Sequence, residues 1–236
     1  MLSLKGGVGK TTTAVGLGMM LATHRGDRVV AVDANPDFGT LAQRGPNDTA
    51  STVRTLLADP GVARYSDVRR HTSQSTSRLE FLGSERDPAI SEAFDYDDYR
   101  AVHDILDRFY NVIITDCGTG LTHSVLSGVL DTADALVVVG SVAIDSARSA
   151  LATMDWLRHR GYSHLTSSTT VALNTVWSDH APVDLNHLRR HFDNRVEHVV
   201  HIPYDDHLAE GVEIRLDRLS RATRYAYQDL ASAVMR

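Results

Sequence analysis

The chain has 236 residues, of which 42% are hydrophobic, and it carries a formal net charge of −6 at pH 7. This size can bury one sizeable core, so we expect a single globular domain, and the acidic balance argues against a protein coated in nucleic acid. One cysteine, Cys117, excludes an internal disulfide and a self-contained metal cluster, and the sequence lacks both a membrane-spanning apolar run and a secretion-signal pattern. We therefore expect a cytoplasmic protein.

Short β-branched runs alternate with segments in which apolar residues recur every three or four positions, a pattern typical of strands joined by helices. Strands are predicted at residues 29–33, 111–116, 135–140, 169–174 and 198–202, and helices at 11–25, 96–108, 146–160, 183–192 and 220–235. Continuous apolar strands with helical crossovers predict a doubly wound α/β fold, in which a mostly parallel sheet carries helices on both faces.

Three other segments are characterised by their length or composition. Residues 2–4 resemble a strand but are shorter than the usual five or six residues. We therefore expect residues 1–236 to form the C-terminal part of a longer chain. The polar segment 71–78 is expected to form a loop, and the acidic segment 84–98 is expected to lie on the surface.

The segment SLKGGVGKTTT at residues 3–13 contains both lysines of the chain, Lys5 and Lys10, whereas every other Lys+Arg residue is an arginine. The end of a strand, a glycine-rich turn and the start of a helix follow in the order that a phosphate-binding loop requires. Backbone N–H groups and the positive end of the helix can face one anion, Lys10 can reach the β- and γ-phosphates, and the Thr11 hydroxyl can ligate Mg²⁺. The predicted phosphate-binding residues are Gly6, Gly7, Val8, Gly9, Lys10, Thr11 and Thr12.

The lysines themselves carry information. In a chain that otherwise uses arginine, a compact ammonium indicates a place where a planar guanidinium does not fit between phosphate oxygens. This argument accounts for Lys10. A phosphate-binding loop confined to one subunit does not require Lys5.

The stretch KGGVGKTT, from Lys5 onward, resembles the deviant Walker A motif of the MinD/ParA ATPases, and the resemblance extends along the whole chain. It implies that Lys5 reaches across an ATP-dependent homodimer to the phosphates of the partner. VVAVDANPD resembles a switch segment with Asp33 as its first acid. NVIITDCGTG resembles the segment that holds the magnesium-bound water through Asp116.

The later motifs resemble the part of this family that contacts the base. TTVALNTV looks like the strand whose last asparagine, here Asn174, hydrogen-bonds adenine. IPYDDHLAEG looks like the loop beside the base, which contains Pro203, Tyr204 and Asp205. The combination is most similar to the MinD-like (EspI-like) ATPases of actinobacterial type VII secretion. This resemblance implies Mg²⁺ and ATP as cofactors and a protein of the secretion machinery as a partner.

One position departs from the family pattern. MinD/ParA proteins usually carry a second aspartate two residues after the first, where it orients or deprotonates the attacking water, and this chain has Asn35 there. An amide accepts a hydrogen bond from water but cannot take its proton, so we expect slow hydrolysis rather than none. Asp33 or Asp37 could take over the role, although Asp37 also fits a simple turn cap.

Plainer interpretations stay open for several residues. Asp33 and Asp116 could be acids that merely end strands, and Asn174 could cap a loop. Cys117 is most simply a small buried side chain. The twelve histidines show no metal-ligand spacing and are expected on the surface.

Rival functions of the same fold fit the residues less well. A guanine-reading motif needs a further lysine, iron–sulfur relatives need at least two cysteines in each subunit, and no substrate motif of a metabolic ligase is present. Two alternatives stay open: an ATP-sensing regulatory module with little turnover, and a ParA-like DNA-binding partition protein.

The C-terminal segment bears on the choice of partner. It lacks the lysines and bulky apolar residues of a membrane-targeting helix, and its Leu and Ala residues predict a core stripe. Arginines recur there every three residues, which could contact nucleic acid or form a solvated face of a helix. We favour the solvated face and consider nucleic acid an improbable partner. The arginines are Arg215, Arg218, Arg221 and Arg224.

Overall fold

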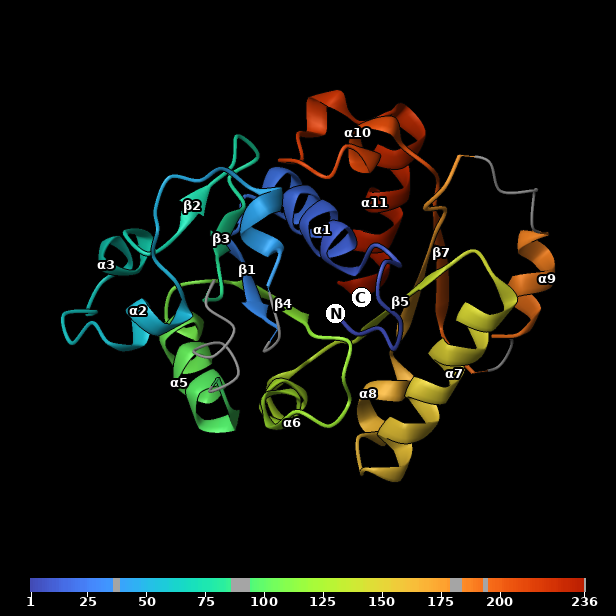
Figure 1. The fold of residues 1–236 in the computed structure, drawn as a ribbon, viewed down its shortest axis with the longest axis horizontal. Helices are drawn as coiled ribbons and strands as arrows, with labels where there is room; N and C mark the ends of the chain where they lie inside the picture. The colour runs from blue at the N-terminus through green and yellow to red at the C-terminus, as the bar shows by residue number, and fades with distance from the viewer. Residues whose placement is uncertain (36–38, 86–93, 179–183, 193–194, 236) are drawn as a thin grey trace.

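Parallel strands with helices on both faces form the centre of the molecule (Figure 1). The computed structural model describes residues 1–35, 39–85, 94–178, 184–192 and 195–235. The described strands are β1 (Val29–Ala34), β2 (Ser73–Gln74), β3 (Glu80–Leu82), β4 (Val112–Cys117), β5 (Val137–Ser141), β6 (Thr170–Asn174) and β7 (His198–Ile202). The described helices are α1 (Lys10–His24), η1 (Leu41–Arg44), α2 (Val53–Leu57), α3 (Tyr65–Arg69), α5 (Tyr96–Asp107), α6 (Ser124–Thr132), α7 (Ile144–His159), α8 (Ser163–Ser167), α9 (Leu185–Arg190), α10 (Asp206–Ala209), η2 (Leu216–Arg218) and α11 (Arg221–Val234).

The strands form two sheets that the first two residues connect. One sheet has the order β2-β3-β1-β4 and the other the order β5-β6-β7, with every pairing parallel except β2 with β3. Between them, the Leu2 N–H donates to the Val137 carbonyl at 2.9 Å, and the Leu2 carbonyl accepts from the Val139 N–H at 2.7 Å. On the other side, the Met1 carbonyl accepts from the Cys117 N–H at 3.4 Å. The glycine-rich segment that follows therefore starts at the centre of the fold.

Each face of the sheets has its own buried cluster. One cluster joins the apolar sides of α1 and α11 to the strands, and the other joins α5, α6, α7 and α8 to the opposite face. Figure 1 shows the same division, with α1 and α11 above the strands and α6, α7 and α8 below them. Burial on both faces explains why β1, β5 and β6 are continuous apolar runs rather than alternating ones.

The expected α/β fold is confirmed, and its five predicted strands lie within two residues of the observed ones. Four of the helices also match closely. The fifth, expected at 183–192, is observed as α9 at Leu185–Arg190, and position 183 lies outside the described residues. Most of segment 84–98 lies outside them as well.

Two expectations about the N-terminal half were met only in part. Of residues 2–4, only Leu2 makes a ladder contact, a single parallel bridge with Val138. The polar segment 71–78 contains β2, whose Gln74 pairs with Glu80 of β3. Serine and glutamine have little intrinsic preference for strands, so this pairing depends on tertiary contacts that the local sequence does not reveal.

The histidines are not all on the surface, as had been expected. His71 is 9% exposed and His207 is 4% exposed, and both ring nitrogens of each have polar partners. His207 accepts the Arg215 N–H at 3.0 Å and contacts Glu210 at 3.1 Å, so it fastens the segment between α10 and η2. A buried imidazole is acceptable when both of its nitrogens are satisfied.

The C-terminal arginines do not share one helical face, which corrects the expectation above. Leu219 is extended and separates η2 from α11, so Arg215 and Arg218 lie outside the helix that begins at Arg221. Arg215 pairs with Asp217 at 3.0 Å and Arg218 with Glu210 at 2.5 Å.

Within the described residues, no helix combines the length and hydrophobicity needed to cross a membrane.

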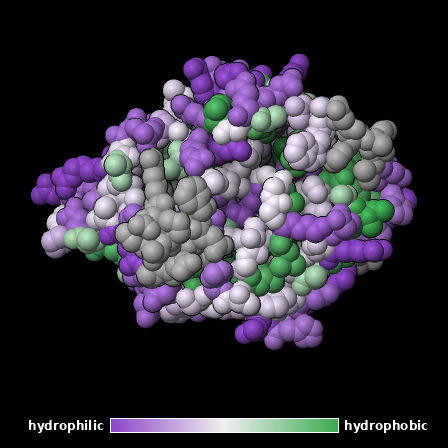
Figure 2. All heavy atoms as spheres, in the orientation of Figure 1, coloured by the Kyte–Doolittle hydropathy of each residue, from purple (hydrophilic) through white to green (hydrophobic). Residues whose placement is uncertain are grey.

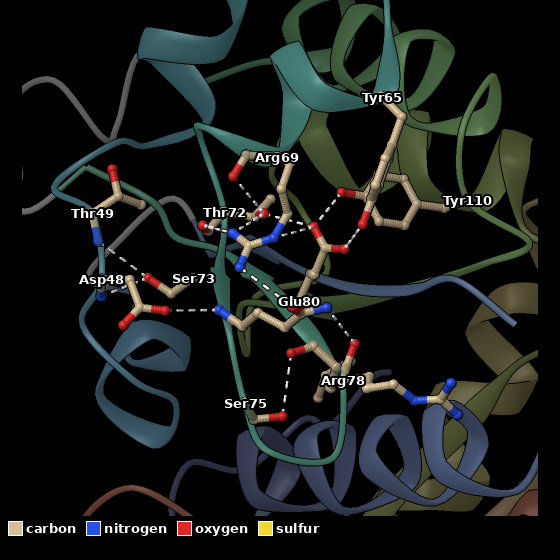
Figure 3. Close-up of polar contacts among 12 residues, drawn as sticks. Asp48, Thr49, Tyr65, Arg69, Thr72, Ser73, Ser75, Arg78, Glu80 and Tyr110 are labelled. Atoms are coloured by element: carbon tan, nitrogen blue, oxygen red, sulfur yellow. Dashed lines mark hydrogen bonds and ion pairs between the residues drawn. The ribbon is translucent and has the colours of Figure 1, made fainter. Parts of the chain in front are cut away.

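A buried carboxylate organises the sheet edge at β3 (Figure 3). Glu80 is 1% exposed, and its oxygens accept hydrogen bonds from Tyr65 at 2.5 Å, from Tyr110 at 2.6 Å and from Thr72 at 2.6 Å. Arg69 lies 3.9 Å away. The figure shows these groups converging on the carboxylate from α3, from the segment between α3 and β2, and from the segment between α5 and β4. Several hydrogen bonds to one buried carboxylate thus connect α3, β3 and the segments that follow α3 and α5.

This cluster predicts a loss of stability in alkali. Burial and then the negative charge of Glu80 raise the pKa of Tyr110, and burial raises that of Tyr65 to about 12. Free tyrosine titrates near 10, so the unfolded chain ionises first, and the free energy of unfolding should fall as the pH rises above about 10. In urea unfolding between pH 7 and 11, Tyr110→Phe should flatten this fall, while lowering stability at pH 7 by about 1–3 kcal/mol because Glu80 loses a donor.

Tyr225→Phe is the matched control, because Tyr225 is exposed and makes no contact with Glu80. It should follow the wild-type pH profile. If Tyr110→Phe also follows that profile, the Tyr110–Glu80 contact does not control alkaline stability.

Candidate functional site

The candidate site lies where the carboxyl ends of β1, β4, β5 and β6 meet the glycine-rich loop, residues 3–9. The chain enters this loop between the two sheets and leaves it as α1. In doubly wound folds, ligands bind in the crevice at this kind of position, where the order of the strands reverses. The fold therefore presents the loop at the edge of the sheet that is suited to bind a ligand.

Two glycines and one asparagine set the shape of the loop. Gly7 and Gly9 have φ angles of 72° and 84°, a region that glycine adopts without strain. The Asn174 amide nitrogen donates to the Val8 carbonyl at 2.7 Å and to the Thr13 hydroxyl at 2.9 Å. A Cβ at Gly9 would lie 2.8 Å from that nitrogen. Asn174, at the end of β6, thus holds the loop against the first turn of α1.

Lys10 and Thr11, at the start of α1, both contact the carboxylate of Asp116 on β4. The Lys10 ammonium lies 2.6 Å from one oxygen of Asp116, and the Thr11 hydroxyl donates to the other oxygen at 2.6 Å. Lys10 is 9% exposed and Asp116 is 1% exposed. The Thr40 hydroxyl is 3.4 Å from that of Thr11. An ammonium, a hydroxyl and a carboxylate, the groups that bind phosphate and a hard cation, are therefore side by side.

A second acid lies directly beside the first. Asp33 on β1 is the register partner of Asp116 on β4. Burial, and then the charge of Asp116, raises the pKa of Asp33 to about 7. Its carboxylate accepts the N–H groups of Asn35 and Leu41, both at 3.1 Å. Asp33 thus holds the backbone at Asn35 and at Leu41, and Asn35 borders the cavity described below.

Lys5 is held differently from Lys10. Its ammonium forms an ion pair with Asp145 in the first turn of α7. The two side chains are 42% and 69% exposed, so solvent screens the pair. The hydrogen bond from Lys5 lowers the pKa of Asp145. The structure therefore places Lys5 at the surface beside the loop, in a contact that can be exchanged for another at little cost.

A cavity of about 540 Å³ brings the predicted residues together. Such a volume is within the range of small-molecule sites. All the predicted phosphate-binding and base-contacting residues line it, together with Lys5 and Asn35, whereas Asp33 and Asp116 lie beneath its floor. The predicted lining residues are Gly6, Gly7, Val8, Gly9, Lys10, Thr11, Thr12, Asn174, Pro203, Tyr204 and Asp205. Asp37, which was considered above as a replacement for the missing second aspartate, lies outside the described residues.

Two of the residues expected beside the base, Asp205 and Asn174, also form hydrogen bonds that stabilise the fold. Asp205 caps α10, and its carboxylate accepts the N–H groups of His207 at 3.1 Å and Ser220 at 2.9 Å. Both hydrogens of the Asn174 amide are donated to Val8 and Thr13. Within the described residues, the side-chain oxygen of Asn174 accepts no hydrogen bond, and it is the kind of group that accepts one from an exocyclic amine. This oxygen can therefore accept a hydrogen bond from a ligand in the cavity.

Sequence reasoning missed several lining residues. Arg44 of η1 donates to the Leu208 carbonyl at 3.3 Å, and burial lowers its pKa. Tyr227 of α11 is fully buried behind the cavity, and Trp177 is 65% exposed at its edge. Arg44 and Tyr227 come from elements remote in sequence, so no local pattern marks them. Trp177 follows Asn174 by three residues and could have been noticed.

The residues present fit a magnesium ion. Thr11 and Asp116 offer a hydroxyl and a carboxylate oxygen, the hard donors that Mg²⁺ prefers, and Mg²⁺ commonly uses only one or two protein ligands beside phosphate and water. Within the described part of the chain, no group of three His, Cys, Asp or Glu residues could hold a metal alone. Bound magnesium would therefore depend on a phosphate ligand for the rest of its coordination.

Comparisons with known proteins agree with this geometry. The CobQ/CobB/MinD/ParA nucleotide binding domain matches residues 1–215. The ESX-1 secretion-associated protein EspI of Mycobacterium tuberculosis is 38% identical over 235 residues, which cover 99% of this chain and 35% of that protein. This chain therefore spans about a third of the length of EspI.

Solved structures share the fold at lower identity. A ParA family ATPase from Chlorobium tepidum has a TM-score of 0.80 and 19% identity, covering 98% of this chain and 95% of that one. The septum site-determining protein MinD from Pyrococcus horikoshii, complexed with Mg-ADP, has a TM-score of 0.73 and 21% identity, covering 98% and 92%. With the match to residues 1–215, these results show that the chain belongs to the CobQ/CobB/MinD/ParA family of nucleotide-binding domains.

Proposed function

We propose that this chain is an ATPase switch that binds Mg-ATP in the cavity, closes into a homodimer and resets by slow hydrolysis. The observation that carries the proposal is the convergence of Lys10 and Thr11 on Asp116, at the start of α1 and beside a cavity of about 540 Å³. The proposal places the chain in the cytoplasm, where ATP is available.

The residues of the loop would bind the phosphates. Positive φ at Gly7 and Gly9 turns the chain tightly, and the N–H groups at the start of α1 provide partial positive charge. Lys10 is held by Asp116 and would turn its ammonium toward the β- and γ-phosphates. An ammonium on a flexible stem can make this change without disturbing the backbone.

Magnesium, when bound, neutralises charge on the phosphates during phosphoryl transfer. The Thr11 hydroxyl and the Asp116 carboxylate, directly or through water, would hold it. Asp33 shares the floor of the site and holds the backbone at Asn35 and at Leu41 through their N–H groups. The amide of Asn35 would position water without taking its proton, which supports slow turnover.

Lys5 supports the homodimer. It is exposed, and its partner Asp145 is also exposed, so the ion pair can open when a phosphate of a second copy comes within reach. Ile144, beside Asp145, is 42% exposed. Figure 2 shows hydrophobic residues gathered on the lower part of this view, between the places that α6 and α7 occupy in Figure 1. An apolar area of this kind suits a protein contact.

The protein partner is proposed from similarity alone. The name of EspI associates it with ESX-1 secretion, so we propose a component of a secretion system as the partner. A DNA-binding role has less support, because Arg215 and Arg218 are paired with carboxylates and do not continue the face of α11. A sensing module with very low turnover is the second candidate, and Asn35 is the feature that favours it.

The two lysines should have separable effects. Lys10→Gln retains a donor for Asp116 but removes the charge, so calorimetry should show a large loss of affinity for ATP and ADP, together with a loss of thermal stability because Asp116 stays buried without its counter-charge. Lys5→Ala should bind nucleotide as the wild type does but should fail to dimerise with ATP in light scattering.

Asp145→Ala is the matched control for Lys5→Ala, because it removes the same ion pair and leaves the lysine. This variant should still dimerise. If Asp145→Ala and Lys5→Ala lose the dimer equally, the ion pair within the subunit matters rather than a contact with the partner. Equal loss of nucleotide binding in Lys5→Ala and Lys10→Gln would show that Lys5 acts in its own site.

Asn35→Asp tests the slow chemistry. A carboxylate at this position can take a proton from water, so single-turnover hydrolysis should become at least about tenfold faster. General-base help is typically worth ~10²–10⁴ in rate, which sets the upper limit of the expected gain. Asn35→Ala separates proton transfer from positioning and should be slower than the wild type. A rate for Asn35→Asp at or below that of the wild type would remove Asn35 from the water-activating position.

A further inference from the structure

Trp177 is the large hydrophobic side chain with the greatest exposure among the described residues, at 65%. It follows β6 and borders the same cavity as the glycine-rich loop. An aromatic side chain of this size can bury about 150–250 Å², so leaving it in water at the edge of a cavity forgoes a favourable contact. This position calls for a flat apolar group that covers the indole when the cavity is filled.

The surrounding residues restrict which part of a nucleotide could lie there. The phosphate-binding groups, Lys10 and Thr11, belong to the start of α1, whereas Trp177 lines the cavity from the segment after β6, which runs beside the end of β7 where Pro203 follows. Apolar and aromatic walls bind a base through its faces rather than its edges. The Asn174 oxygen, three residues before Trp177, is the nearby acceptor for a base edge, because both hydrogens of its amide are used by the loop.

We propose that Trp177 stacks on the base of the bound nucleotide and supplies the main apolar contact at the base end of the cavity. The inference rests on the proposed function, since it requires a nucleotide in this site. It assigns to Trp177 a positioning role: the stacked base fixes the nucleoside, and Asn174 then meets one edge of it. The face of the indole favours purines over the smaller pyrimidines.

The test compares ADP with pyrophosphate, which has the phosphates but no base. Binding of both is measured by calorimetry for the wild type and for Trp177→Ala. Loss of one base–aromatic stack should weaken ADP binding by about 5- to 100-fold and leave pyrophosphate binding unchanged. Trp177→Phe keeps an aromatic face and should lose less affinity for ADP than Trp177→Ala.

Fluorescence provides a direct readout of the contact. The chain has two tryptophans, and Trp156 lies on α7, where it packs against the core and under Arg160. In the Trp156→Phe background, ADP should quench the emission of Trp177, whereas pyrophosphate should not. Tyr225→Ala removes a comparably exposed aromatic side chain outside this cavity and should leave ADP affinity unchanged.

The possible failures are distinguishable. If the wild type binds ADP and Trp177→Ala binds it equally well, the stacking proposal is overturned while the nucleotide site stands. Equal weakening of ADP and pyrophosphate would also overturn it, because Trp177 would then act through the shape of the loop. Normal ADP binding with loss of the ATP-dependent dimer would reassign Trp177 to a subunit interface. Absence of any ADP or ATP binding by the wild type would overturn the proposed function as well.

Discussion

The site depends on one buried ion pair, in which Asp116 accepts both the Lys10 ammonium and the Thr11 hydroxyl at 2.6 Å. Removing one member of such a pair leaves an uncompensated buried charge, which typically costs about 3–5 kcal/mol. Asp33 lies beside Asp116 on the neighbouring strand, so two acids face one cation. Burial, and then this excess of negative charge, explains the raised pKa of Asp33.

A second constraint connects this pair to the rest of the sheet. Asn174 holds the Val8 carbonyl and the Thr13 hydroxyl, while Thr13 donates to the Gly9 carbonyl at 2.8 Å. Asn174 of β6 thus holds the loop on one side, and Asp116 of β4 holds Lys10, the residue that follows the loop, on the other. Because these strands belong to different sheets, the loop and residues 1–2 are what join the two halves at the site. A ligand that orders the loop would act on both halves.

The fold was largely predictable because strands such as β1, β5 and β6 are continuous apolar runs, and helices such as α5 and α11 have a clear apolar face. The sequence also located the loop, since glycines, Lys10 and Thr11 form a local motif with a physical reason for each residue. The features that the sequence did not predict depend on contacts between residues that are far apart in the sequence. The strand at Ser73–Gln74 exists through its pairing with β3, and Arg44 and Tyr227 reach the cavity from elements remote in sequence.

The same reasoning explains the error in the arginine pattern. Arg215, Arg218 and Arg221 keep a regular spacing, but the extended backbone at Leu219 places them on different elements. Local side chains favour this break: Ser220 caps α11 by accepting the Thr223 N–H, and Asp205 accepts the Ser220 N–H. A capping residue within a periodic pattern therefore marks a helix start more reliably than the period marks its continuation.

The two lysines differ in burial, and this difference gives them different roles although they belong to one short segment. Lys10 is enclosed and compensated by Asp116, so its charge serves the interior of the site and its removal affects the floor of the cavity. Lys5 is solvated and paired only with an exposed acid, so its charge can be directed outward without a large desolvation cost. Five positions apart, the same side chain is thus fixed in one case and exchangeable in the other. This difference supports assigning Lys10 to the bound nucleotide and Lys5 to a second subunit.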